Sequence, residues 1–205
     1  NVVVVAPNRG WKTVGDLVAE AKAKPGKLNY ASAGVGAATH LNAEKFKMQA
    51  VFDAVHVPYK GTPEAITDVI GGRADWYFSP LSAALPLIKD GKILPLAVST
   101  PQRTPALPQV PTTVEAGVAG SDYVFWVGMI VPSATPAAVV RRLHEEVTKA
   151  MANADVKERY AKLGAETMLM SSEAFNAFLK TATESAGKGA RAAGRKAQYG
   201  CGARP

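Results

Sequence analysis

Short apolar segments alternate with amphipathic ones along the first hundred residues, which is the pattern of strands alternating with helices. The apolar segments predict strands at 2–6, 28–31, 54–57, 74–78 and 93–99. The amphipathic segments predict helices at about 13–23, 37–48, 62–70 and 80–89. Alternation with such short connections predicts an α/β fold in which a mostly parallel sheet carries helices on both faces.

Local signals mark where several of these helices begin and end. Thr13 followed by Asp16 has the pattern of a capping box, in which two side chains and two backbone N–H groups pair at a helix start. Pro25 and Gly26 stop this helix, because neither residue continues a helix well. Thr62 and Ser79, each placed directly before a proline, are expected to cap the next two helices with their hydroxyl groups.

The second half of the chain has a different pattern. Four prolines within residues 101–111 exclude regular structure and predict a surface connection or a passage between domains. Residues 123–131 are apolar apart from one glycine and predict a buried strand. Helices at 136–151 and 156–163, a strand near 166–170 and a helix from Ser171 complete the prediction. The strands at 2–6 and 123–131 flank the α/β block, and two such strands can form a hinge between two lobes.

Composition places the chain among folded globular proteins. Of its 205 residues 47% are hydrophobic, which excludes a disordered chain, and no apolar run approaches the ~18 residues of a membrane span. The single cysteine, Cys201, and the three histidines lie too far apart for a zinc motif, so no metal is expected. The first residues show no Met, basic segment or cleavage site, so we expect a processed chain or the start of a fragment.

The net charge of +7 raises the question of nucleic-acid binding. Residues 180–205 hold six cations and one anion, so this tail carries +5 and the other 179 residues carry only +2. A nucleic-acid site needs cations spread over a folded face, with aromatic side chains if single strands are bound. The sequence therefore predicts no nucleic-acid partner, and it predicts a helix end followed by disorder for the tail.

Three junctions between a strand and the following helix have similar chemistry. Ligands of open parallel sheets bind outside the carboxyl ends of the strands, and helix starts there offer free N–H groups and a positive partial charge. Such a set suits a carboxylate, although the hydroxyl groups could equally serve as ordinary helix caps. The candidate ligand-binding residues at the three junctions are Ser32, Ala33, Gly34, Gly36, Thr39 and His40; Tyr59, Lys60, Gly61 and Thr62; and Phe78 and Ser79.

Other chemistries fit the sequence less well. The Gly34-x-Gly36-x-x-Thr39 pattern is similar to a dinucleotide fingerprint without its third glycine, but Asp53 precedes its strand, whereas a ribose-binding acid should follow one. No Gly-x-Ser-x-Gly elbow surrounds Ser32. We interpret His56, which lies in an apolar strand, as a core histidine and His144 as part of a solvated helix face. The acids Glu64, Asp68 and Asp75 form no evident acid/base pair, so neither a cofactor nor catalysis is predicted.

Four sequence blocks carry a family resemblance. They are PGKLNYASAG at 25–34, VHVPYKG at 55–61, SAALPLIKDGK at 82–92 and VPTTVEAG at 110–117. In these blocks the chain resembles the Bug family, also called TctC, the substrate-binding components of tripartite tricarboxylate transporters. The resemblance runs from residue 2 to about residue 182.

The resemblance implies a two-lobed periplasmic binding protein of the type II class that captures a small carboxylate (a di- or tricarboxylate, an amino acid or an aromatic acid) without catalysis. Its partners would be the ligand and the membrane components of the transporter, with no insertion into the membrane. It implies a hinge strand at 1–6, a ligand-binding second lobe at 7–101, a Pro-rich connection at 102–122 and part of the first lobe at 123–186. The basic tail at 187–205 departs from the family pattern.

Family members carry a leading part of the first lobe that this chain does not show, so an incomplete first lobe is expected. Two other classes of function stay open. A ligand-sensing effector domain of a regulator would share the two-lobed architecture, and it would need an attached DNA-binding segment. A small-molecule enzyme would need a residue pair whose removal abolishes turnover.

Overall fold

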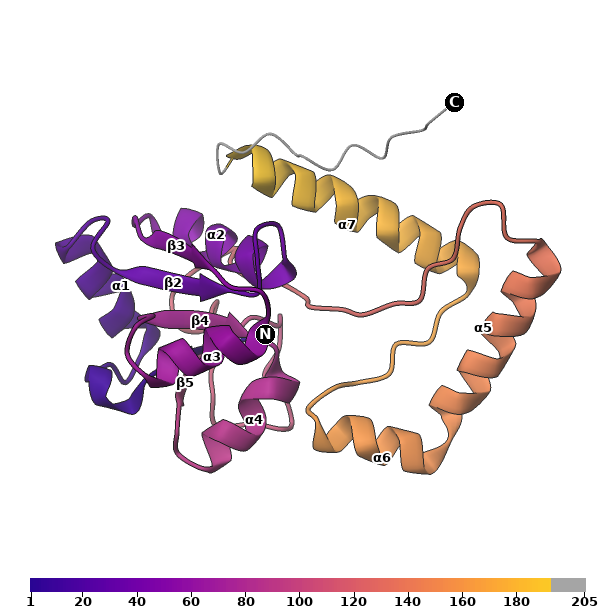
Figure 1. Ribbon diagram of the computed structural model, residues 1–205, viewed down its shortest axis with the longest axis horizontal. Coiled ribbons are helices and arrows are strands. Elements are labelled where there is room, and N and C mark those ends of the chain that lie inside the picture. Colours follow the sequence, from indigo (N-terminus) through magenta and orange to yellow (C-terminus); the bar gives the residue numbers. More distant parts are fainter. Residues whose placement is uncertain (193–205) are drawn as a thin grey trace.

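A five-stranded sheet forms the centre of the molecule in the computed structural model, which describes residues 1–192 (Figure 1). The strands are β1 (Val2–Val5), β2 (Asn29–Ser32), β3 (Val55–Pro58), β4 (Trp76–Ser79) and β5 (Leu94–Val98), in the order β3-β2-β4-β1-β5. β2 runs parallel to β3 and β4, whereas β1 runs antiparallel to its neighbours β4 and β5. The predicted mostly parallel sheet is confirmed, with β1 as its one reversed strand.

Helices cover both faces of this sheet, as the alternating pattern predicts. They are η1 (Pro7–Arg9), α1 (Val14–Ala23), α2 (Ala38–Ala50), α3 (Thr62–Ile70) and α4 (Leu81–Lys89). The capping box at the start of α1 is confirmed, because the Thr13 hydroxyl accepts from the Asp16 N–H at 3.1 Å and the Asp16 carboxylate accepts from the Thr13 N–H at 2.8 Å.

The apolar run of β1 is explained by its central place in the sheet. Val3 and Val5 face a core cluster that α1 and α2 cover, whereas Val2 and Val4 face a second cluster under α3 and α4. All four side chains are fully buried. Alternate residues of a strand point to opposite faces, so a strand buried on both sides must be apolar throughout.

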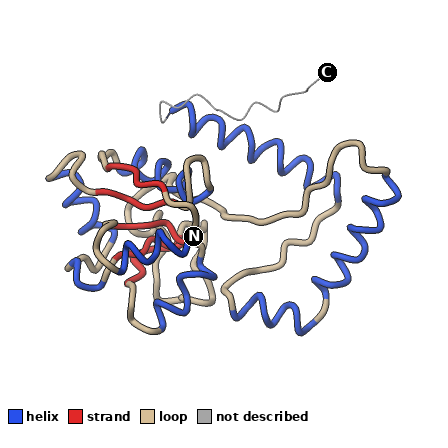
Figure 2. The backbone as a smooth tube through the Cα atoms, in the orientation of Figure 1, coloured by secondary structure: helices blue, strands red, loops and turns tan. Residues whose placement is uncertain are grey.

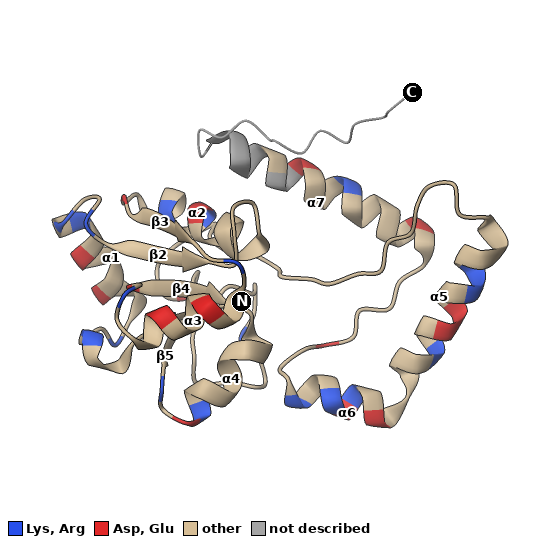
Figure 3. Cartoon of the chain, viewed as in Figure 1, with Lys and Arg blue, Asp and Glu red and all other residues tan. Residues whose placement is uncertain are grey.

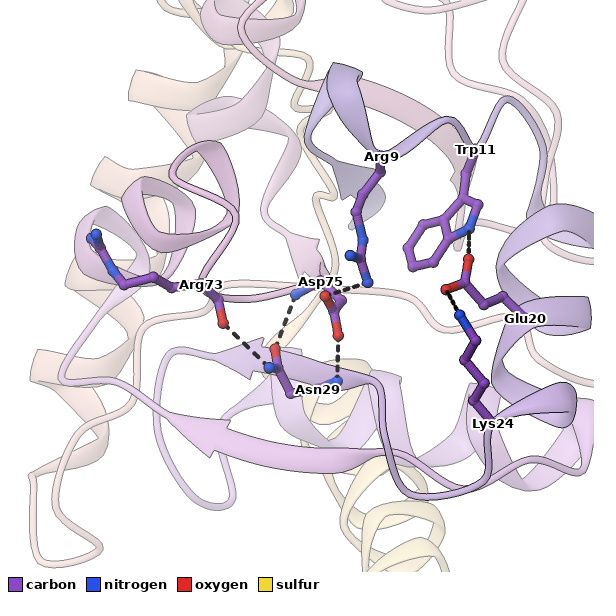
Figure 4. A network of polar contacts seen from close by, with 7 residues as sticks. All are labelled: Arg9, Trp11, Glu20, Lys24, Asn29, Arg73 and Asp75. Atoms are coloured by element: carbon purple, nitrogen blue, oxygen red, sulfur yellow. Dashed lines mark hydrogen bonds and ion pairs between the residues drawn. The ribbon is translucent and has the colours of Figure 1, made fainter.

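The amino ends of β2 and β4 are tied together by a polar network around Asp75 (Figure 4). The Asp75 carboxylate accepts the Asn29 N–H at 2.7 Å and pairs with the Arg9 guanidinium, while the Asn29 side chain accepts the Asp75 N–H at 3.0 Å. Arg9 follows β1, so one carboxylate connects three adjacent strands. This network lies at the edge of the sheet opposite the carboxyl ends of the parallel strands.

The second half of the chain forms an open arm beside the sheet (Figures 1 and 2). It holds α5 (Ala137–Ala152), α6 (Ala154–Lys162) and α7 (Ser172–Ala192), joined by long loops. The predicted strands at 123–131 and 166–170 are both wrong, because these segments are loops. Residues 123–131 are not buried either, and the side chains of Val127 and Ile130 are 86% and 69% exposed.

A strand needs a neighbour to accept and donate its backbone hydrogen bonds, and the described part of the chain offers none to residues 124–131. The apolar residues of this segment therefore have no neighbouring strand to pair with and no sheet to bury them. A cluster of Trp126, Phe175 and Phe178 instead packs the loop against α7, with ring centroids 5.3–6.3 Å apart. The Pro-rich connection at 102–122 contains no helix or strand, as expected.

Charged residues of both signs are distributed along α5 and α6 (Figure 3), and two ion pairs, Arg142–Glu146 and Glu158–Lys162, have i,i+4 spacing. Within residues 1–192, no helix combines the length and the apolar character that crossing a membrane requires. Cys201 and most of the basic tail predicted at 187–205 lie outside the described residues.

Candidate functional site

The three predicted junctions meet at one edge of the sheet. Ser32 of β2 pairs in register with Pro58 of β3, and Ala31 pairs with Tyr77 of β4, so these parallel strands end side by side. α2, α3 and α4 then begin directly beyond the three strand ends (Figure 1). The juxtaposition that the sequence predicts is therefore confirmed, while the ligand-binding role of the residues stays a prediction.

None of these three helices has a side-chain cap. Their N-caps are Ala37, Gly61 and Pro80, which have no side chain that can accept a hydrogen bond. The predicted caps are thus wrong: Thr62 is the first helical residue of α3, and the Ser79 hydroxyl points to the Pro80 carbonyl oxygen at 3.2 Å. Uncapped helix starts keep N–H groups available for a ligand, together with the positive end of the helix dipole.

The β2–α2 loop is held by its own side chains. Three backbone N–H groups have side-chain acceptors, because Ala33 N–H donates to Thr39 Oγ1 at 3.0 Å, Gly34 N–H to Ser32 Oγ at 3.1 Å and Gly36 N–H to His40 Nδ1 at 3.1 Å. Gly34 and Gly36 have φ angles of +125° and +80°, which favour glycine.

Other N–H groups of this loop have no acceptor among the described residues. They belong to Val35 in the turn and to Ala38 and Thr39 in the first turn of α2. Val35 is half exposed, so a ligand can reach the loop from solvent. A carboxylate bound at this junction would therefore accept hydrogen bonds from the backbone N–H groups of Val35, Ala38 and Thr39. The N–H groups of Ala33, Gly34 and Gly36 already have acceptors.

Two tyrosines line this edge, and sequence reasoning missed one of them. The buried Tyr77 hydroxyl lies 3.0 Å from Thr62 Oγ1, so it links β4 to the first residue of α3. Tyr59 donates to Asp68 at 2.8 Å. Burial raises the pKa of Tyr77, and burial together with the Asp68 contact raises the pKa of Tyr59 to about 12. Both phenols are thus neutral at pH 7 and would not repel an anion.

Formal charges at the edge are few. Lys60 is exposed and has neither an ion pair nor a hydrogen bond with the described residues, so its ammonium group can turn toward a ligand. Glu64 sits in the first turn of α3 close to Gly61 and partly neutralises that helix start. A hollow of about 390 Å³ on the outer side of α3 is lined by Glu64 and Asp68, which would repel a carboxylate. The starts of α2 and α4 are the better anion sites.

Two aromatic residues lie differently from what the sequence predicts. Phe78 is fully buried, and its ring packs against Phe46 and Trp76 with centroids 5.4 and 5.9 Å away, so its side chain belongs to the core. His56 is half-buried rather than a core residue, and its Nε2 lies 2.7 Å from the Ser32 hydroxyl. The His56–Ser32 contact joins residues 24 positions apart, so local patterns cannot reveal it.

No group of three or more potential metal ligands occurs among residues that the structure describes, and the donor set at this edge consists of N–H and hydroxyl groups. Such donors recognise anions rather than cations.

His144, expected on a solvated face, is exposed on α5 and contacts the Met170 carbonyl oxygen at 2.9 Å.

The chain matches one known protein family over almost its whole length. The model of the tripartite tricarboxylate transporter family receptors (TctC) matches residues 1–193. A protein of Pseudomonas sp. strain P51, described as the UPF0065 protein in the tcbD-tcbE intergenic region, is 35% identical over 185 residues, which are 90% of this chain and 55% of that protein. The chain thus spans about half the length of this curated relative.

Solved structures of relatives share the fold. Rpa4515 of R. palustris, solved with adipate, has a TM-score of 0.86 and 30% identity, and the match covers 93% of this chain and 64% of that one. MatC (Rpa3494) of Rhodopseudomonas palustris, solved with bound malate, has a TM-score of 0.77 and 26% identity, with 84% and 58% covered. On the evidence of the family match and the shared fold, the chain belongs to the TctC family of tripartite tricarboxylate transporter receptors.

Proposed function

We propose that this protein captures a small carboxylate outside the cytoplasm, as the solute-binding component of a tripartite tricarboxylate-type transporter. The observation that carries the proposal is the row of three uncapped helix starts beyond adjacent parallel strands. The starts of α2 and α4 offer N–H donors and a positive partial charge with no acidic residue in the first turn, which suits a carboxylate. The adipate and malate bound by two relatives are ligands of this chemistry.

Within this proposal the part of the chain at 7–101 is the ligand-binding lobe, and residues 123–186 supply part of the other lobe. The buried residues that the structure describes all lie within residues 1–121, which sets this lobe, together with β1 and the Pro-rich connection, apart from residues 123–186. The arm exposes apolar side chains, and the chain spans 64% and 58% of the lengths of the two solved relatives. We place the ligand's nearer carboxylate against Val35, Ala38 and Thr39 of the β2–α2 junction.

The proposal predicts that adipate or malate raises the melting temperature of this chain. A ligand that binds only the folded state at 100 times its Kd adds about 2.7 kcal/mol of stability. Adipamide, which has the same length as adipate but no charge, is the matched control and should have no effect. A melting temperature that no mono-, di- or tricarboxylate changes would contradict the proposal.

Lys60 should strengthen binding through its charge. We expect Lys60→Ala to weaken adipate binding about 3–10-fold and to reduce its salt dependence, as the loss of one partly screened cation implies. The change is measured by titration calorimetry at low and high salt. Lys92→Ala is the control, because Lys92 is an exposed cation that precedes β5 at the opposite edge of the sheet. Equal affinities of the two variants would exclude Lys60 from the site.

A further inference from the structure

Two histidines from different elements meet at the β2–α2 loop. The rings of His40 on α2 and His56 on β3 stack with centroids 4.0 Å apart and planes 16° from parallel. We propose that His40 and His56 are positioning residues that hold the β2–α2 loop in the conformation that presents its remaining N–H groups to a carboxylate. This inference rests on the proposed function and assigns these residues a role within the same site.

His40 acts on the loop through Gly36. Its Nδ1 accepts the Gly36 N–H at 3.1 Å, so the side chain reaches back from the third residue of α2 to the turn before the helix. Because an accepting Nδ1 holds no proton, this contact assigns the neutral form with its proton on Nε2. Gly36 has a φ of +80°, and the hydrogen bond fixes the orientation of its peptide group.

His56 acts on the same loop through Ser32. Its Nε2 lies 2.7 Å from Ser32 Oγ, and that oxygen also lies 3.1 Å from both the N–H and the carbonyl oxygen of Gly34. A hydroxyl group has one proton to donate. If His56 Nε2 carries a proton and donates it to Ser32 Oγ, the Ser32 hydroxyl can donate its own proton to the Gly34 carbonyl oxygen. Ser32 then holds both the N–H and the carbonyl oxygen of Gly34.

The pair is anchored in the core of the sheet. The His56 ring stacks on Tyr30 at 4.9 Å, and Tyr30 stacks on Trp76 at 5.0 Å. Both Tyr30 and Trp76 are fully buried, and His40 is only 3% exposed. A column of four stacked rings thus connects the glycine-containing loop to the buried core of the sheet, and a loop held in its binding conformation lowers the ordering cost of binding.

The test separates ring packing from hydrogen bonding at His40. His40→Phe keeps a planar ring in the column but removes the acceptor, whereas His40→Asn removes the ring and places an oxygen near the Nδ1 position. We expect His40→Phe to weaken adipate binding about tenfold, as the loss of one hydrogen bond implies, and His40→Asn to restore affinity to within about threefold of the parent. His56→Phe and His56→Gln form the same pair of variants for the contact with Ser32.

A second readout does not depend on any ligand. Amide hydrogen exchange measured by NMR should show the Gly36 N–H exchanging about tenfold faster in His40→Phe and near the parent rate in His40→Asn. An unchanged rate at Gly36 in His40→Phe, or an affinity of His40→Asn as low as that of His40→Phe, would overturn the positioning role. If the parent protein binds neither adipate nor malate, the proposed function fails, while the exchange rates still decide whether the histidines hold the loop.

Discussion

Asp75→Ala is expected to lower the free energy of unfolding by about 2–4 kcal/mol, the largest loss we predict for one polar side chain. The carboxylate is 10% exposed, accepts the Asn29 N–H and pairs with Arg9. Its removal leaves the partly buried Asn29 N–H without this acceptor and the Arg9 guanidinium without its counter-charge. We place the value below that of a fully buried ion pair because the Arg9 side chain is 32% exposed and can regain water.

Urea unfolding of the parent and the variant measures this loss. Asp90→Ala is the control, because the Asp90–Lys92 pair is 3.6 Å long with both side chains 58% exposed. Such a surface pair contributes at most about 0.5–1 kcal/mol. If the two variants lost equal stability, the network of Figure 4 would not connect the strands as we describe. The network supports the ligand site indirectly. It holds the amino ends of β2 and β4 together, and this register also places the carboxyl ends of the two strands side by side at the site.

Gly34→Ala is expected to weaken adipate binding at least tenfold. Gly34 has a φ of +125°, a conformation that costs an L-residue about 1–3 kcal/mol, and a Cβ there would lie 3.5 Å from the Tyr59 carbonyl oxygen. That contact is of ordinary length, so relief of the backbone strain rather than a clash will move the loop. Any movement displaces the N–H groups of Val35 and Ala38 from a bound carboxylate.

Gly91→Ala separates strain from function. Gly91 also has a positive φ, +68°, but a Cβ there would meet nothing within 4 Å, and the residue precedes β5 at the opposite edge of the sheet. Both variants should lose stability in thermal melts, whereas only Gly34→Ala should lose affinity in calorimetric titrations. Normal adipate affinity in a folded Gly34→Ala protein would show that the loop does not bind the ligand.

Much of the sheet and its helices can be predicted because the signals are local. The capping box of Thr13 and Asp16 spans four residues, and the positions of the strands follow from runs of apolar residues. The reversed direction of β1 cannot be predicted in this way, since four valines read the same in either direction. Residues 123–131 have the composition of a strand but lack a neighbouring strand to pair with, and composition does not report that partner.

In the candidate site, too, some features follow from local sequence signals and others depend on residues far apart in the sequence. The junctions after β2, β3 and β4 could be placed at one edge because parallel strands share the direction of their carboxyl ends. The sequence predicts Thr62 and Ser79 as helix caps, but the hydroxyl of Thr62 contacts Tyr77 and that of Ser79 contacts the Pro80 carbonyl oxygen. Tyr77 lies 15 residues from Thr62, and His56 lies 24 residues from its partner Ser32, so no local pattern reports these two contacts.

The most direct test of carboxylate capture at this edge is to follow the backbone amide signals by NMR while adipate is added. We expect saturable shifts at Val35, Ala38 and Thr39, and unchanged signals at Gly10 and Gly91, because these two glycines lie away from the carboxyl ends of the parallel strands. Shifts confined to other parts of the molecule, such as the hollow beside Glu64 and Asp68, or no saturable shift at any concentration, would contradict carboxylate capture at this edge.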